Sequence, residues 1–267
     1  KGPLAATIVA ASAVDAAQLR EPIFIIVTAD EEIGSYGAEF TVEKSQLLLE
    51  SPPNYGIVAE PTHLIPAYAQ KGAAEMTITA HGRAAHTSTD LGVSANFLIA
   101  PFLAEMTALR EQFLNDETYM NHEFVPPTNG FNMIIDDGGT ALNVTAPKTI
   151  CRLAWRIMPD ARSEEILEFI TTSAQNYGFE IDTWSQDPVY TPPDSRLVQV
   201  ACEATGHQNP ITVPFRTDSY YFKTLMDVVI LGPGEISEAH TIGESIALTQ
   251  LEEAVKVYGR MIEALCL

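Results

Sequence analysis

The sequence predicts an α/β fold that is interrupted by an inserted α+β domain, and three observations support this prediction. Residues 23–27 (Ile-Phe-Ile-Ile-Val) form a continuous apolar run, as in a strand that is buried on both faces of a parallel sheet. Strand-like and helix-like segments alternate on both sides of residues 72–184, which is typical of a parallel α/β layer. Within residues 72–184 the strands instead alternate polar and apolar residues and accompany amphipathic helices, which indicates a separate α+β domain.

The composition restricts the class of protein and its partners. The chain has 267 residues, of which 46% are hydrophobic, and this is ample for a packed core. Its 15 basic and 35 acidic residues give a net charge of −20, so we expect neither a nucleic-acid nor a membrane partner. No run approaches the ~20 apolar residues of a membrane span. The three cysteines lack the spacing of a disulfide framework or a zinc knuckle, and reduced cysteines fit a cytoplasmic location.

The elements of the α/β layer can be placed in order along the chain. Apolar residues at helical spacing, with Pro3 in the first turn, predict a helix that leads into the strand at residues 23–27. Pro52 and Pro53 end the next helix and precede a short strand that stops at Glu60. The expected elements are a helix at 4–19, strands at 23–27, 55–59 and 65–70, a helix within 35–50, and, after a proline-rich linker at 188–194, a helix ending at Thr205, strands at 211–213 and 228–231, and a helix at 248–265.

The inserted domain is expected to begin after residue 71, where strands with continuous apolar runs give way to strands that alternate polar and apolar residues. Met76 and Ile78 alternate with Thr77 and Thr79, which predicts a half-buried strand. The expected elements are strands at 73–80, 149–157 and 179–184 and helices at 93–113 and 163–177. Residues 72–184 are therefore assigned to one domain, and residues 1–71 together with 185–267 to the other.

Acidic residues and a histidine recur where predicted strands and loops end. Asp30, Glu31 and Glu32 follow the first strand, Glu60 follows the second, and His240 lies beyond the last. Ligands collect at the carboxyl edge of an open α/β sheet, and carboxylates with an imidazole suit zinc, manganese or cobalt. For the acidic run alone, a solvated loop is an equally good interpretation.

The order of these segments resembles that of the M20 metallopeptidase family, which includes acetylornithine deacetylase, succinyl-diaminopimelate desuccinylase, aminoacylase and the glutamate carboxypeptidases. The resemblance covers nearly the whole chain and rests on short motifs, which are Lys1-Gly2-Pro3-Leu4-Ala5 as the tail of an Asp-Met-Lys-Gly motif, Asp30-Glu31-Glu32, Ala59-Glu60-Pro61-Thr62, a Gly-x-x-x-His motif ending at His86, Gly139-Thr140-Ala141-Leu142-Asn143 with Arg156-Ile157-Met158-Pro159, and Gly232-Pro233-Gly234 followed by Ala239-His240. It implies a zinc-peptidase-like mixed sheet flanked by helices, with the inserted domain as a ferredoxin-like lid and dimerisation domain.

The resemblance also implies a role for individual residues. Glu31 would be the general base, and Glu32 and His240 would bind one metal ion while Glu60 binds the other. His86 would stabilise the oxyanion, contributed by the other subunit of a homodimer. Substrate contacts are expected from Asn143, Arg156, Thr217, Gly232 and Gly234.

The expected function is hydrolysis of the amide bond of an N-acylated amino acid, of the acetylornithine deacetylase or succinyl-diaminopimelate desuccinylase type. Two divalent metal ions, zinc or else cobalt or manganese, would activate the water. The resemblance implies that this activity would belong to amino-acid biosynthesis in the cytoplasm. Two alternatives remain open: a non-catalytic dimerising module or inactive fragment that binds amino-acid-like ligands, and an M20 dipeptidase or carboxypeptidase.

Two motifs of the family are absent from the sequence. The family's His-x-Asp motif, and the Asp that precedes its Met-Lys-Gly and bridges both metals, are not found ahead of Lys1. We therefore expect that upstream sequence is missing, that metal binding is weak, and that the chain is inactive as it stands. Ala59 and Arg216 replace glycines of the family pattern, which affects the expected shape of the pocket.

Overall fold

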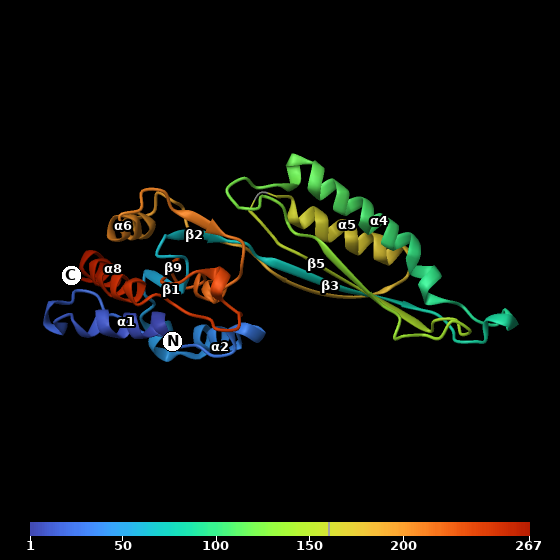
Figure 1. Ribbon diagram of the computed structural model, residues 1–267, viewed down its shortest axis with the longest axis horizontal. Helices are drawn as coiled ribbons and strands as arrows, with labels where there is room; N and C mark the ends of the chain where they lie inside the picture. The colour runs from blue at the N-terminus through green and yellow to red at the C-terminus, as the bar shows by residue number, and fades with distance from the viewer. Residues whose placement is uncertain (160) are drawn as a thin grey trace. The chain divides into compact units, whose positions relative to one another are not determined.

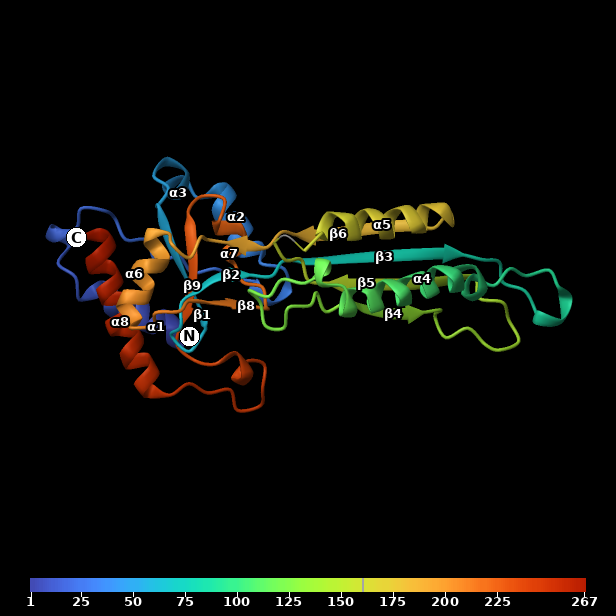
Figure 2. The same ribbon diagram turned by 90° about the horizontal axis from the view of Figure 1, so that it is seen from above.

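The computed structural model describes residues 1–159 and 161–267 and divides the chain into two compact units (Figures 1 and 2). The split unit consists of Lys1–Gln70 and Val189–Leu267, and the inserted unit of Lys71–Pro188. The sequence placed the insertion at residues 72–184. None of the helices in the described part of the chain combines the length and the apolar character needed to cross a bilayer.

The split unit is built on a mixed sheet. Its strands are β1 (Tyr55–Pro61), β2 (Ala67–Gln70), β7 (Val189–Tyr190), β8 (Ile211–Val213) and β9 (Asp227–Gly232). Their order is β1-β9-β2-β7, with β8 also paired to β2. β1 runs parallel to β9, and β2 runs antiparallel to β9. The predicted mixed α/β sheet flanked by helices is therefore confirmed.

Helices cover both faces of this sheet because β9 is apolar on both sides. Val229 and Leu231 pack into one cluster with α1 (Gly2–Ser12), α6 (Arg196–Thr205) and α8 (Leu248–Cys266). Val228 points the other way, since successive strand residues face opposite sides. It packs with residues of α2 (Tyr36–Lys44), α3 (Gln46–Glu50) and α7 (Ser219–Phe222).

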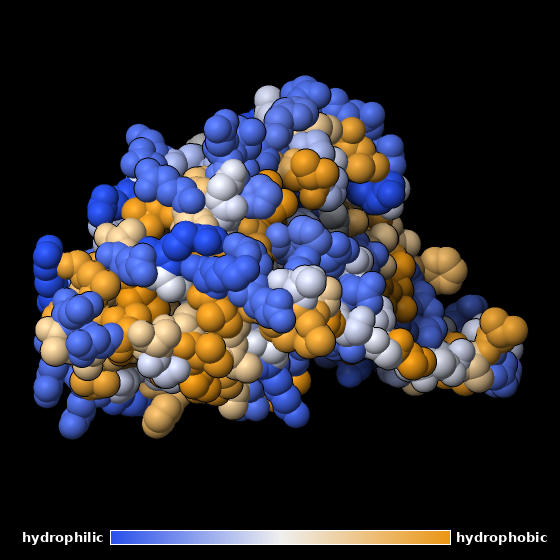
Figure 3. Space-filling model, turned by 60° about the vertical axis from the view of Figure 1, so that its left-hand side comes forward, coloured by the Kyte–Doolittle hydropathy of each residue, from blue (hydrophilic) through white to orange (hydrophobic). Residues whose placement is uncertain are grey.

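Many apolar side chains remain at the surface of the split unit. Val27 is 67% exposed, Phe40 of α2 is 66% exposed, and Ile8 of α1 is 49% exposed. Figure 3 shows apolar side chains in several places on the face turned to the viewer, between hydrophilic ones. Exposure of this extent means that the core of the split unit is incompletely covered by the residues described.

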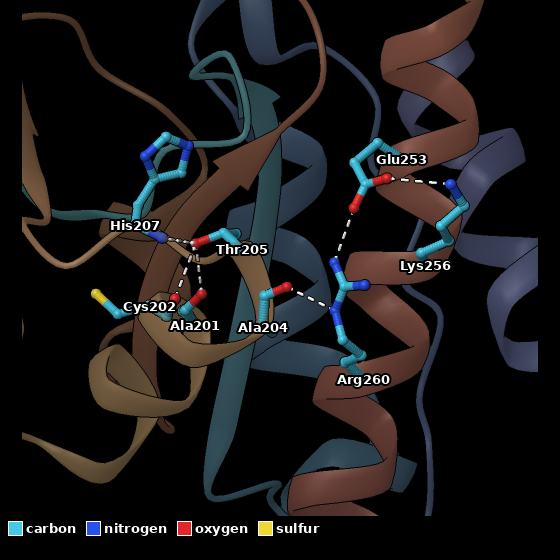
Figure 4. Close-up of polar contacts among 8 residues, drawn as sticks. All are labelled: Ala201, Cys202, Ala204, Thr205, His207, Glu253, Lys256 and Arg260. Atoms are coloured by element: carbon cyan, nitrogen blue, oxygen red, sulfur yellow. Dashed lines mark hydrogen bonds and ion pairs between the residues drawn. The ribbon is translucent and has the colours of Figure 1, made fainter.

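A polar clamp joins the carboxyl end of α6 to α8 (Figure 4). Nε of Arg260 donates to the carbonyl of Ala204 at 2.6 Å, and Nη2 of Arg260 lies 2.9 Å from Oε1 of Glu253. The hydroxyl of Thr205 donates to the carbonyl of Ala201 at 2.9 Å. A cation at the last carbonyls of a helix satisfies acceptors that have no partner within the helix. α8 is thereby fixed against the helix layer that supports β9.

The inserted unit is an antiparallel sheet covered by two helices. Its elements are β3 (Ala73–His81), α4 (Ala95–Asn115), β4 (Asn132–Asp136), β5 (Lys148–Trp155), α5 (Ser163–Asn176) and β6 (Glu180–Gln186). The strand order β4-β5-β3-β6 and the succession βαββαβ are those of a ferredoxin-like fold. Met76 and Ile78 of β3 are buried in one cluster with Phe102 and Met106 of α4 and Ile170 of α5.

One predicted strand is wrong. Residues 23–27 form no strand in the structure, and Ile25 and Val27 are 41% and 67% exposed instead of buried. A parallel strand needs a neighbour to accept its backbone hydrogen bonds, and no strand among the described residues pairs with this segment. The prediction failed because an apolar run favours burial but does not determine which other strand will pair with it. That partner has to come from a different part of the sequence.

The sequence also missed two strands and a short helix. β4 carries mostly exposed side chains at an edge of its sheet, so it lacks the apolar alternation that marks a half-buried strand. β7 lies within the expected linker and pairs with β2. α7 spans a single turn and was not predicted.

Candidate functional site

Carboxylates from three separate segments line one cavity in the split unit. The cavity has a volume of about 990 Å³, and its walls include Glu31, Glu60 and Asp218. Glu60 lies near the carboxyl end of β1, and Asp218 immediately precedes α7. Glu31 begins a 3₁₀ turn at Glu31–Ile33. The cavity thus has an acidic wall at the carboxyl end of β1, the region of an α/β sheet in which ligands collect.

A tight turn orients the acidic run. Asp30 has a φ of 64°, in the left-handed region that Asp adopts more readily than most residues. Its carbonyl accepts a hydrogen bond from the amide of Ser35 at 2.8 Å. Gly37 lets α2 begin close to this turn, because a Cβ at Gly37 would lie 2.4 Å from the carbonyl oxygen of Ala29. Glu31 is thereby held at the cavity wall, while Glu32 is exposed.

Glu60 is positioned by an irregularity between β1 and β9. The register of the two strands shifts between Val58 and Pro61, so Glu60 sits where regular pairing is interrupted. Gly232 of β9 approaches it closely, because a Cβ on that glycine would lie 2.5 Å from the carbonyl oxygen of Glu60. A side chain at position 232 would push the ends of β1 and β9 apart.

Crowding and burial shift the acidity of two of these carboxyls. Burial raises the pKa of Glu60 to about 7, and repulsion from Glu31, Asp218 and Glu32 adds to the effect. Burial also raises the pKa of Glu31, with repulsion from Asp218 and Glu32 as the next causes. Carboxylates gathered in this way favour a proton or a cation between them.

Asp218 belongs to this cluster although the sequence did not place it among the site residues. Its Oδ2 accepts a hydrogen bond from the hydroxyl of Thr28 at 2.5 Å. Its Oδ1 is buried and has no hydrogen-bond partner among the described residues. The signal in the sequence was the Thr217-Asp218 pair, of which only Thr217 was selected.

The structure brings His240 close to Glu32. Nε2 of His240 lies 3.5 Å from Oε2 of Glu32, and the two side chains are 71% and 70% exposed. His240 has a φ of 59°, in a turn that follows Ile236–Glu238. The contact is held by two exposed side chains, so it adds little to stability by itself.

The residues fit a divalent cation in chemistry but do not form a complete binding site. Carboxylate oxygens and an imidazole are suitable ligands for zinc, cobalt or manganese, and the unpartnered Oδ1 of Asp218 is a free acceptor. Within residues 1–159 and 161–267, however, no group of three or more His, Cys, Asp or Glu side chains is arranged to hold a metal ion. Glu32 and His240 supply two donors, and Glu60 stands in the neighbouring carboxylate cluster.

Three residues expected to contact substrate make internal contacts. The hydroxyl of Thr217 is buried, 2.6 Å from Oε1 of Gln70 and 2.7 Å from Oγ of Ser219. The carbonyl of Gly232 accepts from the amides of Thr62 and Leu64. Gly234, at a φ of 96°, donates its amide to Oε1 of Gln250 at 2.6 Å and lines the cavity. Their described contacts shape the loops around the cavity.

His86 and Asn143 lie together in the inserted unit. The backbone of His86 bridges to Val144, and the amide of Thr87 donates to the carbonyl of Asn143 at 3.0 Å. Nδ1 of His86 lies 2.7 Å from the hydroxyl of Ser88, and both His86 and Asn143 are exposed. These two residues therefore present polar side chains on neighbouring loops.

Arg156 lies at the other end of β5. Asn143 precedes the first residue of β5, Lys148, whereas Arg156 follows the last residue, and an antiparallel strand of this length extends for about 24 Å. The amide of Arg156 donates to the carbonyl of Asn129 at 2.7 Å. One inserted unit therefore cannot present Asn143 and Arg156 to the same carboxylate.

Comparisons with known proteins find relatives that match nearly the whole of this chain. Acetylornithine deacetylase of Myxococcus xanthus is 30% identical over 265 residues, which are 96% of this chain and 68% of that protein. Acetylornithine deacetylase of Yersinia pseudotuberculosis is 28% identical over 275 residues, which are 100% of this chain and 69% of that protein.

Solved structures share the fold at lower identity. A tripeptidase from Staphylococcus aureus has a TM-score of 0.63 at 20% identity, with 89% of this chain and 62% of that chain covered. Aminopeptidase PepT from Bacillus cereus has a TM-score of 0.65 at 18% identity, with 89% and 63% covered. This chain thus spans less than two thirds of the length of either solved structure. Peptidase family M20/M25/M40 matches residues 1–264, and the chain belongs to this family.

Proposed function

We propose that this protein is a metal-dependent hydrolase that cleaves the amide bond of an N-acylated amino acid, with Glu31 as the general base. The observation that carries the proposal is the convergence of Glu31, Glu60 and Asp218 on one cavity in a chain that belongs to a family of hydrolases. Two relatives, 30% and 28% identical to this chain, are named acetylornithine deacetylase. An N-acetyl or N-succinyl group on a diamino acid is therefore the first substrate class to test.

The proposed metal ligands are Glu32 and His240 for one ion and Glu60 for the other, with Asp218 as an additional carboxylate. Their types suit zinc, cobalt or manganese. When bound, two divalent cations supply positive charge that lowers the pKa of a water molecule and polarises the amide carbonyl. Because the described residues form no complete ligand set, we expect this chain by itself to bind metal weakly and to turn over slowly.

The side chains of this chain would contribute a proton transfer and a hydrogen bond to the reaction. The carboxylate of Glu31 would take a proton from the attacking water and deliver it to the departing amine. Its raised pKa makes it a better proton acceptor near neutral pH than an ordinary glutamate. His86 would donate a hydrogen bond to the oxyanion of the tetrahedral intermediate.

We further propose that the active enzyme is a homodimer formed through the inserted unit. Asn143 and His86 lie at one end of β5 and Arg156 at the other, so two chains are needed for all three to meet one substrate. The edge strand β4, with Ile134 and Ile135 about half exposed, offers a surface for such pairing. Light scattering tests this, and a strict monomer at assay concentration contradicts it.

The decisive experiment measures metal binding and hydrolysis separately. Cobalt is titrated into the protein while its visible absorption is recorded, and release of ornithine or diaminopimelate is followed with N-acetylornithine and N-succinyl-diaminopimelate. We expect slow hydrolysis that Glu31→Gln abolishes without changing the cobalt spectrum. Glu50→Gln, an exposed glutamate outside the cavity, is the matched control and should behave as the parent chain.

A second candidate function is a non-catalytic module that binds amino-acid-like ligands. The incomplete ligand set among the described residues favours this alternative. Cobalt binding without hydrolysis of either substrate, combined with saturable binding of N-acetylornithine in calorimetry, would support the module and contradict the hydrolase. Hydrolysis of dipeptides in place of both acylated substrates would instead identify an M20 peptidase.

A further inference from the structure

Backbone hydrogen bonds join the two loops that carry Glu60 and His240. β1 runs through Glu60 into a turn at residues 62–64, and β9 ends at Gly232, from which the chain leads to His240. The carbonyl of Gly232 accepts from two amides of the turn, at 3.1 and 3.0 Å. The carbonyl of Gly234 accepts from the middle amide of the turn at 2.8 Å. The position of each loop therefore depends on the other.

The turn at residues 62–64 holds two successive residues in a strained backbone conformation. φ is 56° at His63 and 57° at Leu64, in the left-handed region that histidine and leucine adopt rarely. Such strain persists where surrounding contacts over-determine the conformation, and it gathers at functional sites. The side chain of His63 makes contacts of this kind.

The side chain of Gln250 connects both loops to the first turn of α8. Its Oε1 accepts a hydrogen bond from the amide of Gly234 at 2.6 Å, and its Nε2 lies 2.7 Å from Nδ1 of His63. Because Oε1 faces the Gly234 donor, the NH₂ end of the amide is the end that donates to His63. Nδ1 of His63 is then the acceptor, which requires a neutral imidazole. One amide group thus uses one end on each loop.

The segment that bears His240 is closed on itself. The amide of Glu238 donates to the carbonyl of Glu235 at 3.1 Å, and the hydroxyl of Thr241 donates to the carbonyl of Glu238 at 2.7 Å. Glu235 also forms an isolated antiparallel bridge with the turn after β1. A segment with internal bonds of this kind takes its position from its attachments, which include Gly234 and Glu235.

We propose that Gln250 and His63 are positioning residues that set the distance between Glu60 and His240. This inference rests on the proposed function, in which Glu60 and His240 bind different metal ions. Neither Gln250 nor His63 is a proposed ligand, and each acts through the loop that it holds. Loss of their contact should therefore change metal binding while leaving every proposed ligand in the chain.

Glu235 limits the conditions under which this contact forms. Its Oε1 lies 3.0 Å from the same Nδ1 of His63, and the two side chains are 54% and 55% exposed. A neutral His63 accepts from Gln250 at Nδ1, whereas a protonated His63 donates from Nδ1 to Glu235. The measurements are therefore made at about pH 8, where a histidine side chain is ordinarily neutral.

The first test is Gln250→Leu, which keeps the size of the side chain and removes both of its polar ends. Without metal, hydrogen exchange should accelerate about tenfold for the amides of residues 62–64 and 234–240. The apparent affinity for cobalt should fall about tenfold, and the visible absorption of bound cobalt should change shape, because that absorption reports the geometry of the ligands. Gln199→Leu is the matched control, since Gln199 is an exposed glutamine of α6 outside the cavity, and it should behave as the parent chain.

The second test is His63→Gly, which removes the imidazole and retains a residue that readily adopts a positive φ. It should weaken cobalt binding in the same direction as Gln250→Leu. Combined with Gln250→Leu it should cause no further loss, because residues that act through one contact are not additive.

The outcomes separate this proposal from the proposed function. An unchanged cobalt affinity and spectrum in Gln250→Leu, an equal loss in Gln199→Leu, or additive losses in the double variant would each overturn the positioning role. Absence of cobalt binding by the parent chain would instead contradict the proposed function. The exchange rates, measured without metal, would still show whether Gln250 and His63 fix the two loops, and unchanged rates in Gln250→Leu would exclude it.

Discussion

The two units of this protein complete their sheets to different degrees. In the inserted unit, β3 pairs on both edges, with β5 from Ala74 to His81 and with β6 from Ala73 to Thr79, and one continuous cluster fills the space beneath α4 and α5. In the split unit, β1 pairs on one edge, the buried residues fall into separate clusters, and a cavity of about 990 Å³ lies among them. The described residues thus fill the core of the inserted unit. In the split unit they leave a cavity that is large enough to hold a ligand.

The candidate functional site lies in the less completely packed unit. Carboxylates with raised pKa values occur in the split unit, where packing is incomplete. Burial raises the pKa values of Glu31 and Glu60 by more than nearby cationic groups, such as Arg216 for Glu31, lower them. In the inserted unit, by contrast, the carboxylate of Glu105 accepts hydrogen bonds from Ser173 and Tyr177, which lower its pKa. Carboxylates with raised pKa values cluster at functional sites, so Glu31 and Glu60 mark a candidate site, whereas the hydrogen-bonded Glu105 does not.

The largest expected effect separates activity from stability: a variant at the candidate site of the split unit should lose activity and remain folded. Glu31→Gln should lower kcat for N-acetylornithine by about 10²–10⁴-fold, because a general base contributes this much. The thermal midpoint of the split unit should not fall, since the change removes a charge that is repelled by Asp218 and Glu32. Stopped assays of amine release and calorimetry measure both quantities, and a fall in both together would show that Glu31 is a structural residue.

The next effect compares one residue type in two settings on the same helix. Phe102→Ala should lower the free energy of unfolding by about 3–5 kcal/mol, because Phe102 is fully buried in the core of the inserted unit. Phe97→Ala, also in α4 but 84% exposed, should change it by about 0.5 kcal/mol or less. Urea unfolding followed by circular dichroism tests both variants. Equal costs would contradict the tight packing of Phe102 in the core of the inserted unit.

A pH-dependent effect should be confined to the split unit. The pKa of Glu60 is raised to about 7, so the folded state binds its proton more tightly than the unfolded state. The stability that this proton contributes is present below about pH 4.5 and is lost as the pH rises through about 7. In metal-free buffer at pH 8, Glu60→Gln should therefore stabilise the protein by about 1–2 kcal/mol, with no gain at pH 4.5.

Urea titrations across this range measure the effect on Glu60. Glu75→Gln, at an exposed glutamate near the start of β3, is the control and should show no comparable change with pH. A Glu60→Gln variant that is equally stabilised at both pH values would mean that the effect arises from packing and not from the charge.

The smallest effect concerns the exposed pair of Glu32 and His240. Glu32→Gln should change the free energy of unfolding by about 0.5 kcal/mol or less, because both side chains are about 70% exposed. The apparent affinity for cobalt should nevertheless fall about tenfold or more if Glu32 is a ligand. Titration of cobalt absorption measures this, and an unchanged affinity would remove Glu32 from the proposed metal site.

The sequence alone determined the elements whose patterns are local. The alternation around Met76 and Ile78, the helical period of α4 and α5, and the strands β1, β5, β6 and β9 follow from burial on one or both faces, and each is near its predicted place. Glu31, which follows the apolar run at residues 23–27, and Glu60, near the end of β1, stand out because a carboxylate interrupts the apolar pattern of the sequence around it.

Only the tertiary structure decided which of these residues meet. It added Asp218 to the acidic cluster, turned the hydroxyl of Thr217 inward, and placed Asn143 and Arg156 at opposite ends of β5. It also gave residues 23–27 no partner strand among the described residues, although their sequence is typical of a buried strand. The physical reason is that hydrophobic periodicity encodes how much of a segment is buried, whereas the neighbour that buries it is set by contacts distant in the chain.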